Sequence, residues 1–202
     1  LFKSLLKWMI PVISMNTIRG KYLLDFSNTE GYFTSHSNKR YHVKHLEKCK
    51  DFKVLYTGVD LEDFIYLEKK FDPSVIRLLF IGRISEEKGF FLLLEQLAHL
   101  RKKIKKEIRL TVVGDFNNRQ EKKIIQRALA DFGLSECVLF KGHIQRERLF
   151  KVYHQADFTV FPSICEEAFS RIPLESMSCG TPCLSTDNPG SKELFEINSP
   201  LL

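Results

Sequence analysis

The chain has 202 residues, of which 44% are hydrophobic and 28% are charged. This composition is ordinary for a folded globular protein, and it excludes a collagen, a disordered chain and a small disulfide-stapled domain. The net charge of +6 suits an anionic ligand or a membrane surface without requiring either. The five cysteines form no CxxC pair, so we expect reduced thiols in a cytoplasmic compartment.

The first residues resemble a signal peptide only superficially. Lys3 and Lys7 interrupt their apolar stretch and Pro11 breaks it. Beyond residue 18 the longest apolar run covers residues 90–94, far short of the roughly 20 residues that a membrane-spanning helix needs. Because the chain opens on Leu1 rather than on Met, we expect it to be part of a longer protein.

From Arg77 onward, segments typical of strands and of helices alternate. Short apolar runs that end near glycine or proline predict strands over residues 77–82, 108–114, 137–140, 157–161 and 182–185. Apolar residues at helical spacing predict helices over residues 90–104, 120–130, 146–155 and 173–179. Strict alternation with short connections predicts a Rossmann-like, doubly wound parallel sheet of the α/β class. In such sheets the ligand binds at the carboxyl ends of the strands.

The first 57 residues have a different character. A polar stretch over residues 35–40 separates the apolar start from a strand-like segment over residues 53–56. Asp72, Pro73 and Ser74 are typical of a linker. We therefore expect a boundary between about Gly58 and Ser74.

A glycine-rich loop with two cations follows the first strand of the predicted sheet. Gly82 and Arg83 come at the end of that strand, and Lys88 and Gly89 precede the next helix. Glycine lets the backbone approach a ligand, and a helix N-terminus offers unpaired N–H groups. A planar guanidinium and a mobile ammonium complete a set that suits a diphosphate. A solvated charged loop is the alternative interpretation.

Two carboxylates eight residues apart, Glu167 and Glu175, flank the start of a predicted helix. The amides of Phe169, Ser170 and Arg171 would point outward from this helix N-terminus, which suits an anion. Glu175 could accept hydrogen bonds from two neighbouring hydroxyls, such as those of a ribose. The alternative is that Glu175 only complements the helix dipole.

The order and spacing of these motifs resemble the retaining glycosyltransferases of family 4, which have the GT-B fold. The resemblance runs from Tyr56-Thr-Gly-Val-Asp60 to Pro189-Gly-Ser-Lys-Glu193, and the Glu167/Glu175 pair is its most specific part. It implies that residues 1–57 end an incomplete acceptor-side domain and that residues 58–74 are a hinge. Residues 75–202 would be the nucleotide-sugar-binding domain, truncated at its end, and we expect this chain to be inactive alone.

The resemblance also implies roles for single residues. Arg83 and Lys88 would bind the donor diphosphate and stabilise charge on the leaving nucleotide. Glu167 would contact the transferred sugar, and Glu175 would hold the ribose hydroxyls.

Further donor contacts are implied at the backbone. The amides around Phe169 and Ser170 would bind phosphate, and Gly82 and Gly114 would let the chain approach the donor. His143, at the end of a predicted strand, could touch the base, and a loop histidine with no role is the equal alternative. Ala168 and Ser170 stand where the family pattern has glycine, so a positive φ at either would be strained. Glu193 is expected in the loop after the last strand, in a structural or sugar-contacting position.

The reaction implied is transfer of a hexose from a nucleotide sugar to a glycan or lipid-linked acceptor, with retention of anomeric configuration, in surface polysaccharide biosynthesis. We expect neither a cofactor nor a metal, since the sequence has no Asp-x-Asp motif. The basic cluster over residues 101–106 could face an anionic membrane, although such a charge run is more often a solvated helix face.

Two alternatives stay open, a GT-B sugar-nucleotide epimerase and a non-catalytic nucleotide-sugar-binding or scaffold domain. The epimerase is not expected to carry the Glu167/Glu175 pair. Nucleic-acid binding is disfavoured, because the basic residues lie on separate predicted helices without interleaved aromatic residues.

Overall fold

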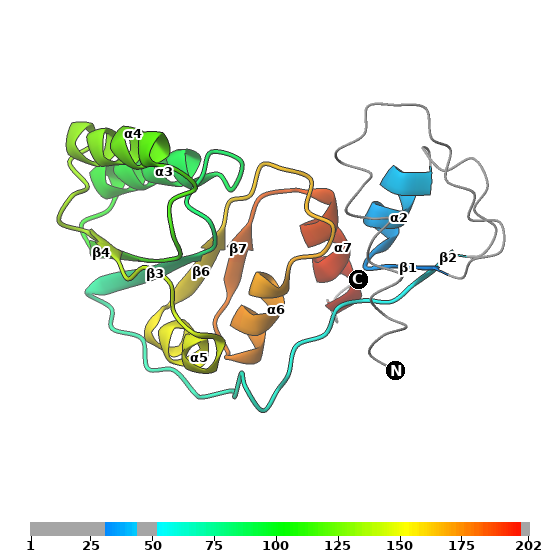
Figure 1. Ribbon diagram of the computed structural model, residues 1–202. Helices are drawn as coiled ribbons and strands as arrows, with labels where there is room; N and C mark the ends of the chain where they lie inside the picture. The colour runs from blue at the N-terminus through cyan, green and yellow to red at the C-terminus, as the bar shows by residue number, and fades with distance from the viewer. Residues whose placement is uncertain (1–30, 44–51, 199–202) are drawn as a thin grey trace.

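The computed structural model describes residues 31–43 and 52–198, and its main part is a five-stranded parallel sheet (Figure 1). The strand order is β5-β4-β3-β6-β7. These strands are β3 (Val75–Ile81), β4 (Glu107–Val113), β5 (Val138–Phe140), β6 (Phe158–Phe161) and β7 (Cys183–Ser185). The order reverses at β3, so the predicted doubly wound, Rossmann-like sheet is confirmed.

Helices connect these parallel strands and cover both faces of the sheet (Figure 1). The connecting helices are α3 (Phe90–Lys103), α4 (Arg119–Asp131), α5 (Arg146–Gln155) and α6 (Arg171–Ser178), and α7 (Pro189–Asn198) follows the last strand. Helices α3 and α4 lie on one side of the sheet, and α5 and α6 lie on the other. The sequence did not predict α7, where we had expected a loop.

Strand β3 shows why the sheet is buried on both faces. Leu78 and Phe80 belong to the apolar cluster under α3 and α4, whereas Leu79 belongs to the cluster that contains α5 residues. Successive side chains of a strand point to opposite faces, so a continuous apolar run fills two cores at once. Leu79 and Phe80 are 0% and 1% exposed.

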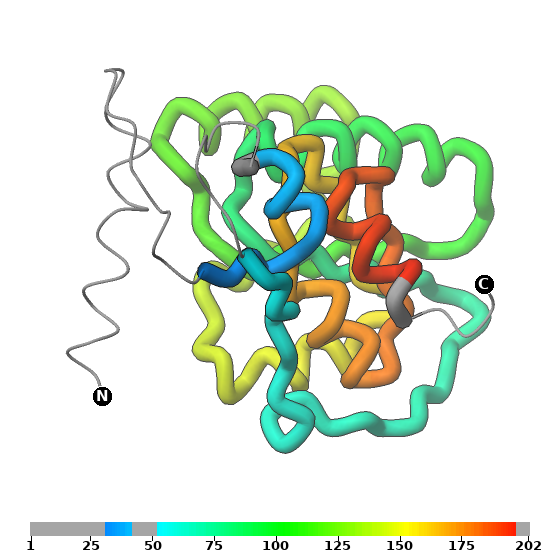
Figure 2. Tube along the Cα trace, turned by 90° about the vertical axis from the view of Figure 1, so that its right-hand side faces the viewer, coloured from blue at the N-terminus to red at the C-terminus, as the bar shows by residue number. Residues whose placement is uncertain are grey.

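A second, smaller unit precedes the sheet. Strands β1 (Gly31–Phe33) and β2 (Phe52–Val54) pair in parallel, and helix α2 (His36–Val43) follows β1. The polar stretch that we had taken as a separator is therefore largely a helix. Ser35 caps it, because its Oγ accepts a 3.0 Å hydrogen bond from the amide of Asn38. Figure 2 shows α2 beside α7.

Residues 55–74 join the two units without forming a helix or a strand. Phe64 is 1% exposed and packs edge-on against Tyr153 of α5. Lys69 donates hydrogen bonds to the carbonyls of Tyr153, at 2.8 Å, and Ala156. The connection is thus fastened to the C-terminal end of α5. Among the described residues, no helix combines the length and the apolar character that crossing a membrane requires.

Candidate active site at the carboxyl ends of the strands

Glycines let the loops after β3, β4 and β5 pack closely at the carboxyl edge of the sheet. Gly82 and Gly114 have φ values of +139° and +130°. A Cβ atom on Gly114 would lie 2.0 Å from the carbonyl oxygen of Gly82. The amide of Gly114 in turn donates a 2.9 Å hydrogen bond to the carbonyl of Gly142. A side chain at Gly114 would therefore force these strand ends apart.

Lys88 and Glu167 meet at this edge. Lys88 Nζ donates a 2.5 Å hydrogen bond to Glu167 Oε1, and Ser163 Oγ donates a 2.7 Å bond to the same oxygen. The two charged side chains are 21% and 15% exposed. Cys165 Sγ lies 3.5 Å from this carboxylate. The sequence reasoning did not single out Ser163 and Cys165, although both lie between the end of β6 and Glu167.

The environment of this pair favours both charges. Burial acts to raise the pKa of Glu167, but the hydrogen bonds from Lys88 and Ser163 outweigh it, and the pKa lies below its ordinary value. Burial acts to lower the pKa of Lys88, but the hydrogen bond to Glu167 outweighs it, and that pKa is raised. The ammonium and the carboxylate are therefore both ionised at neutral pH, in a half-buried setting that strengthens their action on a ligand.

Arg83 does not contact the Lys88/Glu167 pair. Its side chain is 60% exposed and donates a 2.6 Å hydrogen bond to Glu87, four residues along the chain. Exposed pairs at this spacing contribute only about 0.3–0.5 kcal/mol. The guanidinium is therefore free to exchange Glu87 for an anionic ligand at the strand edge.

Glu175 is 4% exposed and is the fifth of the eight residues of α6. Its Oε1 accepts a 2.9 Å bond from Arg146 Nη1, and its Oε2 accepts a 3.0 Å bond from the hydroxyl of Tyr153. The sequence reasoning identified neither partner. A carboxylate has about four lone-pair sites, so these two bonds leave capacity for further donors.

A pocket of about 360 Å³ brings together three of the predicted residues, His143, Ser170 and Glu175. Arg146 also lines it. The sequence placed these residues on three separate segments, and the structure gathers them beside the N-terminus of α6. The pocket offers an acceptor carboxylate, a hydroxyl and an imidazole to a polar ligand.

The loop that leads into α6 is free of backbone strain. Ser170 is the N-cap residue, with φ −83° and ψ 137°, and no residue other than glycine in the described ranges has a positive φ. The strain considered for Ala168 and Ser170 therefore does not arise. Pro173 lies in the first turn of α6, where its missing N–H removes no helical hydrogen bond.

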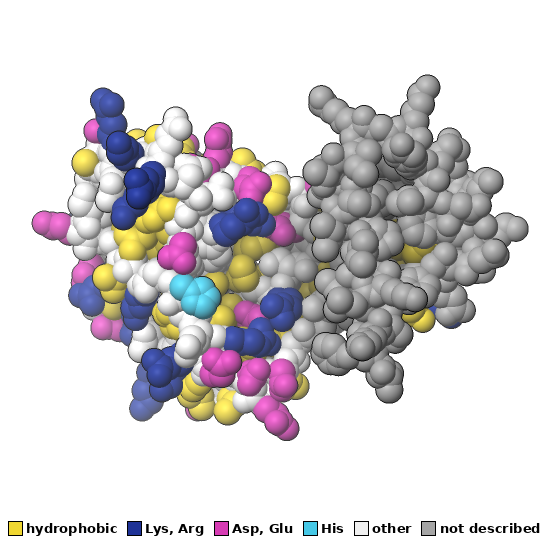
Figure 3. All heavy atoms as spheres, viewed as in Figure 1, with side chains coloured by type: hydrophobic (Ala, Val, Ile, Leu, Met, Phe, Trp, Pro, Cys, Tyr) yellow, Lys and Arg dark blue, Asp and Glu magenta, His cyan; other side chains and the backbone are white. Residues whose placement is uncertain are grey.

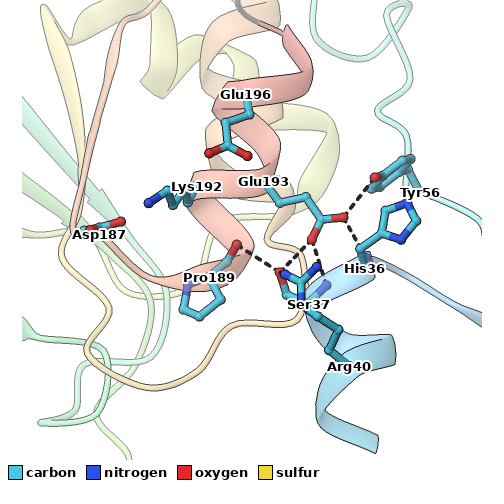
Figure 4. A pocket seen from close by; sticks show the side chains of 9 residues that line it. All are labelled: His36, Ser37, Arg40, Tyr56, Asp187, Pro189, Lys192, Glu193 and Glu196. Carbon is cyan, nitrogen blue, oxygen red and sulfur yellow. Dashed lines mark hydrogen bonds between the residues drawn. The ribbon is translucent and has the colours of Figure 1, made fainter. Parts of the chain in front are cut away.

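Glu193 lies on α7 rather than in a loop, which corrects our expectation. Figure 4 shows its carboxylate pointing toward His36 and Ser37 of the smaller unit and toward Tyr56 of the connection. These residues line a second pocket, of about 690 Å³, between α2 and α7.

Charges are mixed on the face of the molecule shown in Figure 3. Several Lys and Arg side chains gather at the upper left of this view, over α4, and elsewhere on this face Lys and Arg lie among Asp and Glu. Residues Arg101, Lys102 and Lys103 lie exposed at the end of α3, and Arg101 donates a hydrogen bond to the carbonyl of Gly133. The basic end of α3 thus complements the negative end of the helix dipole.

Comparison with known proteins identifies relatives of this chain. A sequence model of the family "Glycosyl transferases group 1" matches residues 67–199. The lipopolysaccharide 1,2-N-acetylglucosaminetransferase of Salmonella typhimurium is 34% identical over 121 residues, which are 57% of this chain and 31% of that protein. The D-inositol 3-phosphate glycosyltransferase of Pseudarthrobacter chlorophenolicus is 32% identical over 133 residues, 65% of this chain and 31% of that one. The matched part is thus about a third of these two relatives' length.

Solved structures share the fold. HepE from Anabaena, in complex with UDP and glucose, superposes with a TM-score of 0.69 at 21% identity, covering 81% of this chain and 46% of HepE. A glycosyltransferase from Rickettsia africae gives a TM-score of 0.71 at 18% identity, and the match covers 90% of this chain and 53% of that one. At these identities the likeness establishes the fold, which is the donor-side half of a GT-B glycosyltransferase.

Proposed function

Since the chain belongs to the group 1 glycosyl transferase family, we propose that it binds a nucleotide sugar and takes part in transferring the hexose to an acceptor. The single observation that carries this proposal is that one segment, between β6 and α6, holds both Glu167, which pairs with Lys88, and Ser170, which lines the pocket that contains Glu175. A cation and a carboxylate lie at the carboxyl ends of β3 and β6, where a doubly wound sheet binds its ligands.

In the proposed mechanism the donor diphosphate contacts Lys88, Arg83 and the N-terminus of α6. Departure of the nucleoside diphosphate places negative charge on its phosphate, and fixed cations and helix N–H groups stabilise that charge. Arg83 leaves Glu87 to reach the diphosphate, because the exposed pair is weak. Gly82 and Gly114 allow the backbone to approach the donor.

Glu167 and Glu175 are assigned to the two ends of the donor. Glu167, held by Lys88 and Ser163, contacts the transferred sugar and stabilises the positive charge that develops on it. Glu175 accepts hydrogen bonds from the ribose hydroxyls with its remaining lone pairs, while Arg146 and Tyr153 fix its orientation. His143, in the same pocket, contacts the base.

The finer parts of the function are proposals that follow from the family resemblance. We propose that the reaction retains the anomeric configuration, uses no metal or other cofactor, and builds a surface polysaccharide from a glycan or lipid-linked acceptor in the cytoplasm, with peripheral contact to the inner face of the membrane. Residues 1–57 would belong to the acceptor-side domain and residues 58–74 to the hinge. The names of the two curated relatives, a lipopolysaccharide enzyme and an inositol phosphate enzyme, support a hydroxylated acceptor.

A thermal-shift panel of UDP-, GDP- and ADP-sugars against the purified protein tests this proposal. We expect one nucleotide series to raise the melting temperature and the other two to have little effect, because ligand that binds only the folded state stabilises it. A GT-B epimerase would convert the bound donor without acceptor, which chromatography of the donor detects. The absence of any nucleotide response would favour a scaffold domain and contradict the proposal.

A further inference from the structure

Glu193 joins the two units of the molecule through four hydrogen bonds. Its Oε1 accepts a 2.6 Å bond from the amide of His36 and a 2.9 Å bond from the hydroxyl of Tyr56. Its Oε2 accepts bonds from the amide and the Oγ of Ser37, at 2.8 Å and 2.6 Å. Figure 4 shows these bonds between α7 and the start of α2.

This carboxylate supplies what α2 lacks. The first turn of α2 contains no acidic residue, and its first amides have no partner within the helix. Glu193 satisfies two of these amides and places a negative charge at the positive end of the helix dipole. Burial acts to raise the pKa of Glu193, but the bonds from Ser37, His36 and Tyr56 outweigh it and lower the pKa to about 2.

The segments that Glu193 joins also hold the loop beside the candidate active site. Ser35 Oγ, at the N-cap of α2, donates a hydrogen bond to the carbonyl of Ala168. The ring of Tyr56 packs against that of Phe169, with centroids 5.1 Å apart. From the other side, α7 packs so closely that a Cβ on Gly190 would lie 2.3 Å from the carbonyl oxygen of Glu167.

We propose that Glu193 is a positioning residue for the donor site, acting through α2 and Tyr56 on the loop from Glu167 to Ser170. This inference rests on the proposed function. By anchoring the smaller unit on α7, Glu193 fixes Ser35 and Tyr56 where they hold Ala168 and Phe169. The loop then presents the Glu167 carboxylate and the amides before α6 in one geometry.

Such an arrangement couples donor binding to the docking of the two units. If docking orders the loop, donor binding must stabilise docking by the same free energy, since coupling between two sites is reciprocal. The amides of His36 and Ser37 should therefore exchange their hydrogens more slowly when the donor is bound.

Hydrogen exchange followed by mass spectrometry tests the inference in the purified protein. In Glu193→Gln we expect faster exchange in peptides that cover residues 165–170 as well as in α2, with unchanged exchange in β3 and β4. The matched control is Glu196→Gln, since Glu196 lies exposed on the same helix and lines the same pocket. This control should match the wild-type protein throughout.

A milder variant distinguishes a local change in exchange from general unfolding of the protein. Tyr56→Phe keeps the ring that packs on Phe169 and removes one bond to Glu193, so its exchange change should be smaller and in the same places. The affinity for the nucleotide sugar chosen by the panel should fall by at least about fivefold in Glu193→Gln, the lower end of typical coupling.

The outcomes separate this inference from the proposed function. Faster exchange in α2 with unchanged exchange at residues 165–170 would overturn the positioning role and leave Glu193 as a helix cap only. The exchange measurement needs no donor, so it stands even if no nucleotide sugar binds. Failure of every nucleotide sugar to bind would contradict the proposed function and not the positioning role.

Discussion

Lys88 and Glu167 lie 79 positions apart in the sequence and share a 2.5 Å hydrogen bond in the fold. Lys88 precedes α3 and Glu167 follows β6, so the contact joins the ends of two neighbouring strands. In the proposed function, Lys88 would bind the diphosphate of an activated sugar and Glu167 would face its electron-poor anomeric carbon.

Arg83→Ala should weaken donor binding without destabilising the fold. The Arg83 side chain is 60% exposed, and its ion pair within the described part of the chain is the weak one with Glu87, so its removal costs little stability. A lost hydrogen bond to a charged phosphate corresponds to about 1.5–3 kcal/mol, or roughly 10- to 100-fold in affinity. Calorimetric titration with the nucleotide sugar selected by the panel and a thermal melt of the free protein measure the two quantities. Unchanged affinity would remove Arg83 from the diphosphate site.

Glu175→Gln should abolish discrimination between the nucleoside diphosphate selected by the panel and its 2′-deoxy form. A carboxylate accepts both ribose hydroxyls, whereas an amide offers one acceptor and two donors. The wild-type protein should bind the ribose form about tenfold more tightly than the deoxy form, a loss typical of one hydrogen bond to a charged group. Competition titrations measure this ratio. Equal discrimination in the variant and the wild type would show that Glu175 acts only on Arg146 and Tyr153.

The Lys88/Glu167 pair should make stability depend on pH at both ends of the scale. The pKa of Glu167 is lowered in the folded state, so its contribution is present above an unfolded value of about 4.3 and is lost as the pH falls. The pKa of Lys88 is raised, so its contribution is present below about 10.4 and is lost as the pH rises through the folded value.

Urea denaturation of the wild type and of Glu167→Gln tests this dependence. At pH 7 the variant should be less stable by about 2 kcal/mol, because Lys88 loses its charged partner in a half-buried site. The difference should shrink between pH 5 and pH 3. A difference that is constant over this range would mean that the carboxylate charge does not contribute.

Gly114→Ala should destabilise the protein more than Gly133→Ala. Both glycines have positive φ, but a Cβ on Gly114 would lie 2.0 Å from the Gly82 carbonyl, whereas a Cβ on Gly133 would meet nothing within 4 Å. Gly133→Ala should cost about 1 kcal/mol, from backbone strain alone. Gly114→Ala should cost several times that amount, or prevent folding. Similar unfolding midpoints for the two variants would contradict the close packing of the strand ends.

The periodicity of the chain was enough to predict the sheet, because each strand and helix carries its own apolar pattern. The contacts of α2 explain why that helix was missed. Most of its residues are polar, and its first turn depends on the carboxylate of Glu193, which lies 156 positions from Ser37 in the sequence. No local pattern reports such a partner. The missed helix α7 did leave a signal, since Asn188 caps its first turn and Pro189 is its first residue.

The candidate site was only partly accessible to the same reasoning. Glu167 and Glu175 stood out by their spacing, and the structure places Glu167 in the loop after β6 and Glu175 within α6. Their partners did not stand out, because Arg146 and Tyr153 are ordinary residues of an amphipathic helix until the sheet brings α5 beside α6. Tertiary packing, rather than sequence spacing, selects such partners.

Calorimetric titration of the nucleotide sugar selected by the panel into matched lysine variants tests the central claim most directly. Lys88→Ala removes the ammonium group that pairs with Glu167. Lys192→Ala removes an exposed ammonium group on α7, which lines the pocket between α2 and α7. We predict at least about tenfold weaker binding in Lys88→Ala and wild-type affinity in Lys192→Ala. Equal affinity in all three proteins would contradict the placement of an activated sugar between Lys88 and Glu175.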